Sequence, residues 1–258
     1  MQYAVCPECD NPIQIIGLYR LPANVKAPYG RHLCHNADGV AQDDAPSRED
    51  CGYFKPQLRK KTDRKPRLDK RGRKILACLI EEFDHVITVF QQVTGISPGP
   101  KLLERMLDTY RRERGYLYMG ATMLNVPWIF AYMTDSQSLV FQHIKHNPEL
   151  VEAVEAHVPD AEIRDGRIRP KKGTFIELDM CFVGHERHRS DDRSGASEVM
   201  SMIVTHGVGD ASREIYRKDI VFDHAVFRDL MEGPDHAGHL RHELVTLARK
   251  KLGDLLRS

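Results

Sequence analysis

The chain of 258 residues is 41% hydrophobic and 29% charged, a composition that supports a packed core beneath a polar surface. No apolar run reaches the roughly 18–20 residues that a membrane-spanning helix needs, and the first residues lack the basic and apolar regions of a signal peptide. We therefore expect a cytoplasmic protein without a membrane partner. Its six cysteines are too sparse for a disulfide scaffold and are better suited to a metal site.

Four of the cysteines lie near the start of the chain, beginning with the C-x2-C pair Cys6 and Cys9. Zinc prefers four Cys or His ligands in a tetrahedral array, and a C-x2-C turn presents two thiolates to one point. We predict that Cys6, Cys9 and Cys51 bind zinc. Either Cys34 or His32 completes the site, because residues two apart share one face of a strand. A closed site of this kind is structural, and an iron–sulfur cluster on the four cysteines is the alternative.

The first 54 residues contain several prolines and glycines and few helix signals, with one short strand pair expected over residues 13–21. A segment with so little apolar surface needs a metal or disulfides in order to fold alone. We therefore predict a zinc-ribbon-like, zinc-binding module over residues 1–54.

A basic arm follows at residues 55–74, where eleven Lys and Arg residues against two aspartates give a net charge of +9 in a chain whose total is +1. Clustered cations are typical of nucleic-acid binders, because each phosphate that they neutralise releases counterions. The arm has no aromatic residue, so we expect it to contact phosphates and not to stack on bases. A solvated linker is the alternative. The predicted contacts are Lys55, Arg59, Lys60, Lys61, Arg64, Lys65, Arg67, Lys70, Arg71, Arg73 and Lys74.

Helical periodicity runs from the end of the arm through residues 70–94, and Gly95 is suited to end this helix. A second helix is expected over residues 101–114. The pair forms either a plain helical hairpin or a helix-turn-helix element. Three arginines at its end join the predicted nucleic-acid contacts: Arg111, Arg112 and Arg114.

Residues 116–146 are largely apolar, which predicts a buried helical hairpin interrupted at Pro127 and a further helix from about residue 136. A short helix is expected over residues 148–158. Residues 75–158 are thus predicted to form a mainly helical region.

The pattern changes in residues 159–258, where apolar and polar residues alternate in three runs. This alternation predicts a small antiparallel β-meander followed by C-terminal helices. The expected strands are residues 174–183, 198–206 and 213–222, with a polar loop at 184–197, and the expected helices lie near 225–231 and 238–257.

Two carboxylates, Glu177 and Asp179, share the polar face of the first of these strands. Such a pair can hold Mg²⁺ for phosphodiester hydrolysis. Together with Pro159 and Asp160 they faintly resemble the restriction-nuclease pattern, although Asp179 stands where that pattern has a lysine. A divalent-metal-dependent nuclease is therefore the alternative function.

The polar loop is the other place where metal-binding or proton-transferring residue types gather. We expect its members to be surface residues. They are His185, Glu186, His188, Asp191 and Asp192.

The sequence therefore predicts an α+β protein with four segments, namely the zinc-binding module, the basic arm, the helical region and the β-meander with its helices. We expect it to bind nucleic acid, DNA in preference to RNA, and not to be an enzyme. It would act alone or with other protein subunits in a larger nucleoprotein complex such as RNA-guided defence or mobile-element machinery. A purely structural adaptor, with the arm as a spacer, is the third hypothesis.

Overall fold

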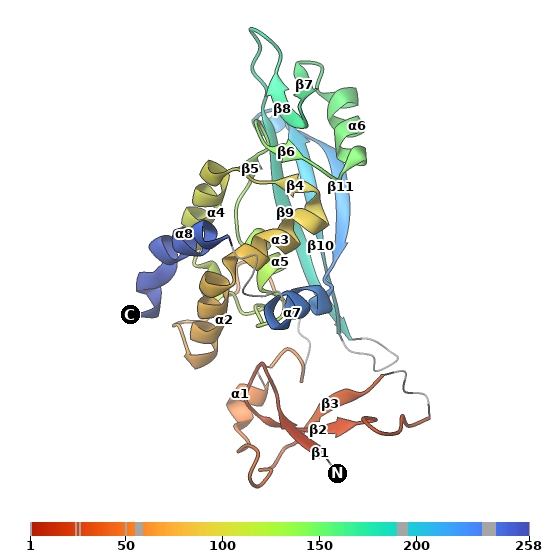
Figure 1. Cartoon of the computed structure of the whole chain (residues 1–258), viewed down its shortest axis with the longest axis vertical. Coiled ribbons are helices and arrows are strands. Elements are labelled where there is room, and N and C mark those ends of the chain that lie inside the picture. Colours follow the sequence, from red (N-terminus) through yellow and green to blue (C-terminus); the bar gives the residue numbers. More distant parts are fainter. Residues whose placement is uncertain are drawn as a thin grey trace. The chain divides into compact units, whose positions relative to one another are not determined.

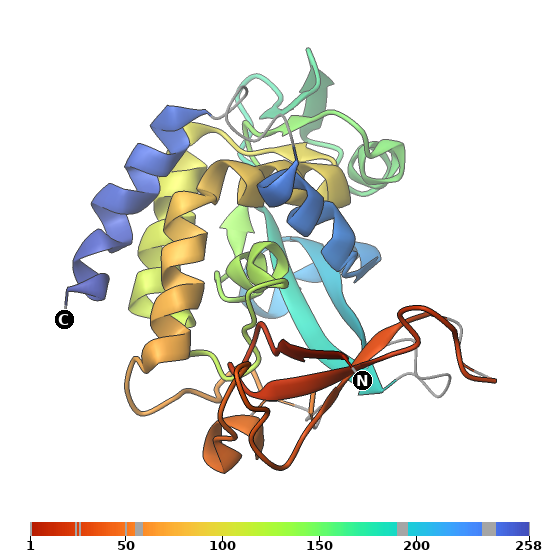
Figure 2. The ribbon, with the colours of Figure 1, turned by 60° about the horizontal axis from the view of Figure 1, so that its bottom comes forward.

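The computed structural model describes residues 2–23, 25, 27–49, 51–54, 59–189, 196–233 and 241–257. The chain divides into two compact units (Figures 1 and 2). The first unit consists of residues 1–60 and 186–199, and the second consists of residues 61–185 and 200–258. The predicted division of the chain at residues 54, 74 and 158 is a finer one and stays a prediction.

A three-stranded antiparallel sheet forms the frame of the first unit. Its central strand β2 (Pro12–Ile16) pairs with β1 (Gln2–Val5) on one side and β3 (Tyr29–His32) on the other. The predicted strand pair over residues 13–21 is wrong in its second half, because Gly17 takes a positive φ of 83° and ends β2. A short helix, α1 (Ala45–Glu49), follows β3 in this unit.

The second unit begins with two consecutive helices where one was predicted. The helix expected over residues 70–94 is interrupted at Glu82, so that α2 (Lys70–Glu81) and α3 (Phe83–Thr94) are separate elements. The side chain of Asp69 caps the start of α2 by accepting from the Gly72 amide, and Gly95 ends α3 in the left-handed region as predicted.

The next helix, α4 (Pro100–Arg112), matches its prediction within two residues. Between α3 and α4 lies a two-residue strand, β4 (Ile96–Ser97), which pairs with β6 (His143–Ile144). This connection therefore belongs to a sheet and is not the short turn of a helix-turn-helix element.

The apolar stretch after α4 is less helical than predicted. It contains the single turn η1 (Gly115–Leu117) and the seven-residue helix α5 (Val126–Tyr132), all of whose residues are buried. The helix predicted from residue 136 is absent from this described segment, which instead forms β5 (Gln137–Ser138) and β6. The predicted helix over residues 148–158 is confirmed as α6 (Pro148–His157), which Asn147 caps.

Two four-stranded sheets complete the second unit. The smaller has the order β4-β6-β8-β7, where β7 (Ala161–Arg164) and β8 (Arg167–Pro170) form an antiparallel hairpin. The larger has the order β11-β10-β9-β5, and its three long strands are the predicted meander. They are β9 (Leu178–Arg189), β10 (Ala196–His206) and β11 (Arg213–Val221).

The strands β9 and β10 extend well into the segment predicted as a polar loop. That prediction is wrong for His185, Glu186 and His188, which lie on β9, whereas Asp191 and Asp192 lie outside the described residues. The alternation of buried residues continues to Arg187, so the strand pattern was present but was obscured by charged side chains.

The chain ends with α7 (His224–Glu232), α8 (His242–Leu252) and a final turn, η3 (Gly253–Leu256), after a turn η2 (Gly209–Ala211) before β11. The main core lies between these helices and the inner face of the large sheet. Phe90 of α3 packs edge-on against Phe182 of β9, and Trp128 of α5 stacks on Phe222 at 5.0 Å.

The protein is therefore a mixed α+β chain, as predicted. None of the helices in the described ranges combines the length and the apolar character that crossing a bilayer requires.

We predict that Gly95→Ala destabilises the second unit more than Gly173→Ala does. Both glycines have a positive φ, 71° and 83°, so each alanine carries the left-handed strain of about 1–2 kcal/mol. A Cβ on Gly95 would also lie 2.7 Å from the His146 carbonyl oxygen, whereas nothing lies within 4 Å at Gly173. Urea unfolding of the two variants should separate them, and equal losses would contradict the steric argument.

Candidate metal centre

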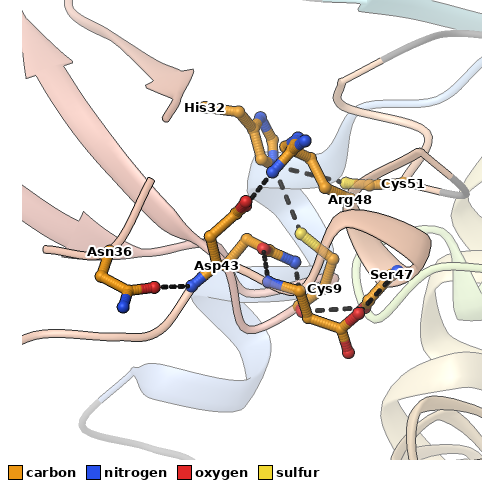
Figure 3. A network of polar contacts seen from close by, with 9 residues as sticks. Cys9, His32, Asn36, Asp43, Ser47, Arg48 and Cys51 are labelled. Atoms are coloured by element: carbon orange, nitrogen blue, oxygen red, sulfur yellow. Dashed lines mark hydrogen bonds and ion pairs between the residues drawn. The ribbon is translucent and has the colours of Figure 1, made fainter. Parts of the chain in front are cut away.

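Three cysteines and one histidine from distant parts of the first unit converge on one point. Cys6 and Cys9 lie in the turn between β1 and β2, His32 ends β3, and Cys51 follows α1. Their ligand atoms all lie within 4.8 Å of one another, close enough to bind a metal ion. Within the described ranges, no other group of three or more His, Cys, Asp or Glu side chains is this close. Figure 3 shows His32, Cys9 and Cys51 pointing toward one another.

The separations between these atoms suit a single tetrahedral ion. The Sγ atoms of Cys6 and Cys51 lie 3.9 Å apart, and Nε2 of His32 lies 3.3 Å from Sγ of Cys9 and 3.6 Å from Sγ of Cys51. Metal–sulfur and metal–nitrogen bonds of about 2.3 and 2.0 Å at tetrahedral angles require separations of roughly 3.8 Å between sulfurs and 3.5 Å between sulfur and nitrogen. The site therefore has the dimensions of a four-coordinate shell.

The C-x2-C turn is built by its own backbone. The Asp10 amide donates to the Cys6 carbonyl at 3.0 Å, and the Cys6 amide donates to the Asn11 carbonyl at 2.8 Å. Asp10 takes a left-handed φ of 58°, which Asp tolerates better than most residues. This reversal places the thiols of Cys6 and Cys9 on the same side of the hairpin.

The fully buried side chain of Asn11 ties this turn to the segment that carries Cys51. Its Nδ2 donates to the Cys9 carbonyl at 3.1 Å, and its Oδ1 accepts from the Asp44 amide at 2.7 Å. Ser47 of α1 donates its hydroxyl to the same Cys9 carbonyl at 3.0 Å. Helix α1 is thereby held beside the turn, and the chain leaving it brings Cys51 to the site (Figure 3).

The site is shielded from solvent and strongly polarised. Cys6, Cys9 and Cys51 are at most 5% exposed, and His32 is half-buried. Hydrogen bonds from the thiols of Cys51 and Cys6 lower the pKa of Cys9, whereas the same network raises the pKa of Cys51. Burial opposes the charging of His32, but hydrogen bonds and charges from Cys6 and Cys9 raise its pKa to about 9. The ligand set thus concentrates negative charge at one point.

Aromatic and cationic side chains orient His32. The imidazole packs edge-on against the Phe54 ring, with 5.4 Å between the ring centroids. The Arg48 guanidinium lies over the same phenyl ring, 5.5 Å from its centroid. Arg48, which is buried, also forms an ion pair with Asp43. These contacts restrict the orientation of the histidine ring.

The predicted alternative ligand Cys34 is not part of the cluster. Strand β3 ends at His32, so the alternation that would place residues 32 and 34 on one face does not continue, and Cys34 is exposed. Of the two candidates, His32 is therefore the one that the fold brings to the site. The fold does not bring together the four cysteines that the iron–sulfur alternative requires, because Cys34 lies outside the cluster.

Residues 186–199 contribute a supporting ion pair that sequence analysis missed. The buried Arg187 forms an ion pair with the fully buried Glu198 and lies over the Tyr53 ring at 5.7 Å. Burial alone would lower the pKa of Arg187, but the carboxylates of Glu198 and Glu8 raise it above its usual range. A Cβ on Gly52 would lie only 1.5 Å from Arg187 Nη1, so a side chain here would displace the guanidinium from its present position.

The basic arm is only partly exposed, and two of its cations are committed to the fold of the second unit. Lys61 Nζ donates to the Thr134 carbonyl at 3.3 Å and lies over the Tyr132 ring. Arg64 donates to the Glu113 carbonyl through Nε and Nη2 at 3.0 and 2.9 Å. Burial lowers the pKa of both groups. Half-buried cations that already donate to backbone carbonyls are poorly placed to contact a phosphate.

Other members of the arm also reach back to the protein. Lys65 pairs with Asp69 at 2.7 Å, Arg71 donates to the Ala121 carbonyl, and Arg73 donates to the Leu256 carbonyl. Arg59 is half-buried, and Lys55 lies outside the described residues. Lys60, Arg67, Lys70 and Lys74 are exposed. Contact of any of these residues with nucleic acid stays a prediction.

The three arginines at the end of α4 differ in their surroundings. Arg111 binds Asp254 in a bidentate ion pair, with both distances at 2.6 Å, and Arg112 contacts the carboxylates of Glu113 and Asp135. Arg114 is exposed and has a left-handed φ of 52°. Arg114 is therefore the best placed of the three for an external anion.

The two candidate nuclease carboxylates are half-buried at the start of the large sheet. Asp179 lies on β9 opposite Ser138, and Glu177 precedes the strand, where its carbonyl accepts from the Gly207 amide and His206 Nδ1. Neither carboxylate belongs to the group of converging ligands.

Comparison with protein families, with curated proteins and with solved structures finds no match for this chain. The function is therefore inferred from the geometry of the chain itself.

We predict that Cys9→Ser abolishes metal binding while Cys34→Ser leaves it intact. The first change removes a buried ligand, and the second removes an exposed thiol outside the cluster. The bound metal, measured by elemental analysis after purification with zinc present, should fall from about one ion per chain to near zero only for Cys9→Ser. Equal metal content in the two variants would remove Cys9 from the site.

Proposed function

We propose that this chain is a nucleic-acid-binding protein whose first unit folds around a structural zinc ion. A cationic surface of the second unit, which we call the basic end, carries the nucleic-acid part of the proposal. The basic end comprises the start of α2, the end of α4 and the end of α8. Its exposed cations are Arg67, Lys70, Lys74, Arg114, Arg249, Lys250 and Arg257.

These helix ends lie together although they are far apart in sequence. Helix α8 runs beside both α2 and α4 (Figure 2). Arg73 of α2 donates to the Leu256 carbonyl at 3.0 Å, and Arg111 of α4 donates to the Lys251 carbonyl at 2.7 Å. The C-terminal helix therefore adds its cations to those of the basic arm, a contribution that the charge run at residues 55–74 does not reveal.

Neighbouring carboxylates are already engaged by other cations. Asp254 is held by Arg111, Asp108 lies 2.9 Å from Lys251, and Asp135 lies 2.6 Å from Arg112. These ion pairs neutralise three acids near the exposed Lys and Arg side chains of the basic end. A polyanion with regularly spaced phosphates is the partner that such a surface attracts most strongly.

The donor set and spacing support zinc as the metal. Three thiolates and one imidazole form one of the usual tetrahedral zinc environments, and all four positions are supplied by the protein. Such a closed shell leaves no position for a substrate, which favours a structural role. The C-x2-C turn lies on a β-hairpin, and we therefore also propose to group the first unit with zinc-ribbon-like modules.

The basic end does not by itself choose between DNA and RNA, because it addresses phosphates that both share. DNA remains our preferred target, and membership of a larger nucleoprotein complex remains part of the proposal. Both points depend on binding measurements with defined nucleic acids.

We predict that the double variant Lys70→Ala/Lys74→Ala weakens nucleic-acid binding and lowers its dependence on salt. If each lysine contacts one phosphate, the slope of log affinity against log salt should fall by about 2. Titration of a labelled 20-base-pair duplex at several salt concentrations measures both quantities.

The matched control is Lys171→Ala/Lys172→Ala. It removes the same charge from exposed positions next to β8, at the opposite end of the second unit from α2 and the C-terminus (Figure 1). Affinity and slope should stay close to those of the parent protein. Equal effects of the two double variants would show a non-specific charge effect and would contradict a localised basic end.

A further inference from the structure

One stretch of the first unit combines cations and aromatic residues without any carboxylate. No Asp or Glu occurs between Asp10 and Asp38, yet this stretch contains the cations Arg20, Lys26 and Arg31 together with Tyr19 and Tyr29. Strands β2 and β3 lie within it. The stretch of residues 11–37 therefore carries a net charge of +3, a sign that favours a polyanion.

The register of the sheet separates the metal-binding face from an outer face. His32 lies opposite Ile13, which in turn lies opposite Ala4, and this row carries the imidazole toward Cys9. Because successive side chains on a strand point to opposite faces, the neighbouring row points away from the metal.

That neighbouring row consists of Tyr3, Gln14 and Arg31, one from each strand. Tyr29, opposite Ile16, shares the same face. We call Tyr3, Gln14, Tyr29 and Arg31 the outer face. The outer face thus presents two aromatic rings, an amide and a guanidinium on a sheet whose other side is held by the metal ligands.

The side chains of the outer face are accessible. Tyr3 is 42% exposed, and Arg31 is exposed with its Nη2 donating to Gln14 Oε1 at 2.7 Å. Beyond the end of β2, Tyr19 is 85% exposed, and its hydroxyl accepts from Gln2 Nε2 at 2.5 Å. Gln2 precedes Tyr3 on β1 and points to the opposite face, so Tyr19 lies outside the outer face.

We propose that the outer face binds single-stranded nucleic acid, with bases stacking on Tyr3 and Tyr29 and phosphates contacting Arg31. The inference rests on the proposed nucleic-acid function and specifies its substrate class. Exposed aromatic rings on a positively charged sheet gain stacking energy only from bases that are not already stacked in a duplex.

A protein partner is the competing occupant, because Val5, Leu18 and Leu21 are also between 43% and 51% exposed. Exposed apolar residues of this kind mark protein contacts as well. Nucleic acid is favoured because Arg31 shares a face with Tyr3 and Tyr29, and the stretch of residues 11–37 contains no Asp or Glu.

The test compares three labelled probes: a 20-nucleotide oligo(dT), an abasic strand of equal length, and a duplex of equal length. Tyr3→Ala should weaken oligo(dT) binding by roughly 5- to 150-fold, the range for loss of one stacked base, and leave binding to the other two probes unchanged. Tyr3→Phe, which keeps the ring, should bind oligo(dT) like the parent. Metal content and thermal unfolding equal to those of the parent establish that each variant is folded.

Tyr29→Ala provides a second variant on another strand of the outer face, in case Tyr3→Ala does not fold, and the same selective loss is expected. Phe175→Ala is the matched control, because Phe175 is 80% exposed but belongs to the second unit. Unchanged oligo(dT) binding by both tyrosine variants, or an equal loss on the abasic strand, would overturn the inference. It would leave the outer face to a protein partner.

The two proposals fail in different ways. Binding of the parent protein to none of the three probes would reject the proposed function together with the inference. Binding to duplex and oligo(dT) that is equally tight and insensitive to Tyr3→Ala would keep the proposed function and reject only the outer face as a single-strand site.

Discussion

The first unit depends on the convergence of three thiols and one imidazole. Apart from the cysteines, the apolar residues that pack at this centre are few, namely Ile13, Tyr53 and Phe54. So small a core cannot offset the conformational entropy of ordering the unit. A tetrahedral metal in a Cys3His site can contribute about 10–16 kcal/mol, because the ligands converge only in the folded state. The sheet, the turn and α1 are all arranged to bring those four atoms together.

The same convergence explains why the first unit is assembled from two separate segments. Gly52 follows Cys51 directly and leaves space for Arg187, whose charge is balanced by Glu198. An arginine buried beside a metal site needs such a partner, since an unpaired buried charge is strongly destabilising. The ends of β9 and β10 therefore belong to the support of the metal centre as well as to the large sheet.

Positive charge has two different uses in the second unit. Lys61 and Arg64 are turned inward onto backbone carbonyls and aromatic rings, where they hold the segment after residue 60 against the body of the unit. The exposed cations of the basic end instead come from three helix ends that meet in space. Net charge along the chain cannot distinguish these uses, because it does not report which side chains are desolvated.

Sequence alone determined the features that depend on local geometry. The C-x2-C turn, the cap at Gly95, helix α6 and the three alternating strands follow from residues within a few positions of one another. Tertiary structure decided the rest. It chose His32 over Cys34 because β3 ends at residue 32, interrupted the long helix at Glu82, and turned Arg64 inward. The positions of His32 and Arg64 depend on contacts between residues far apart in the chain, which no local periodicity records.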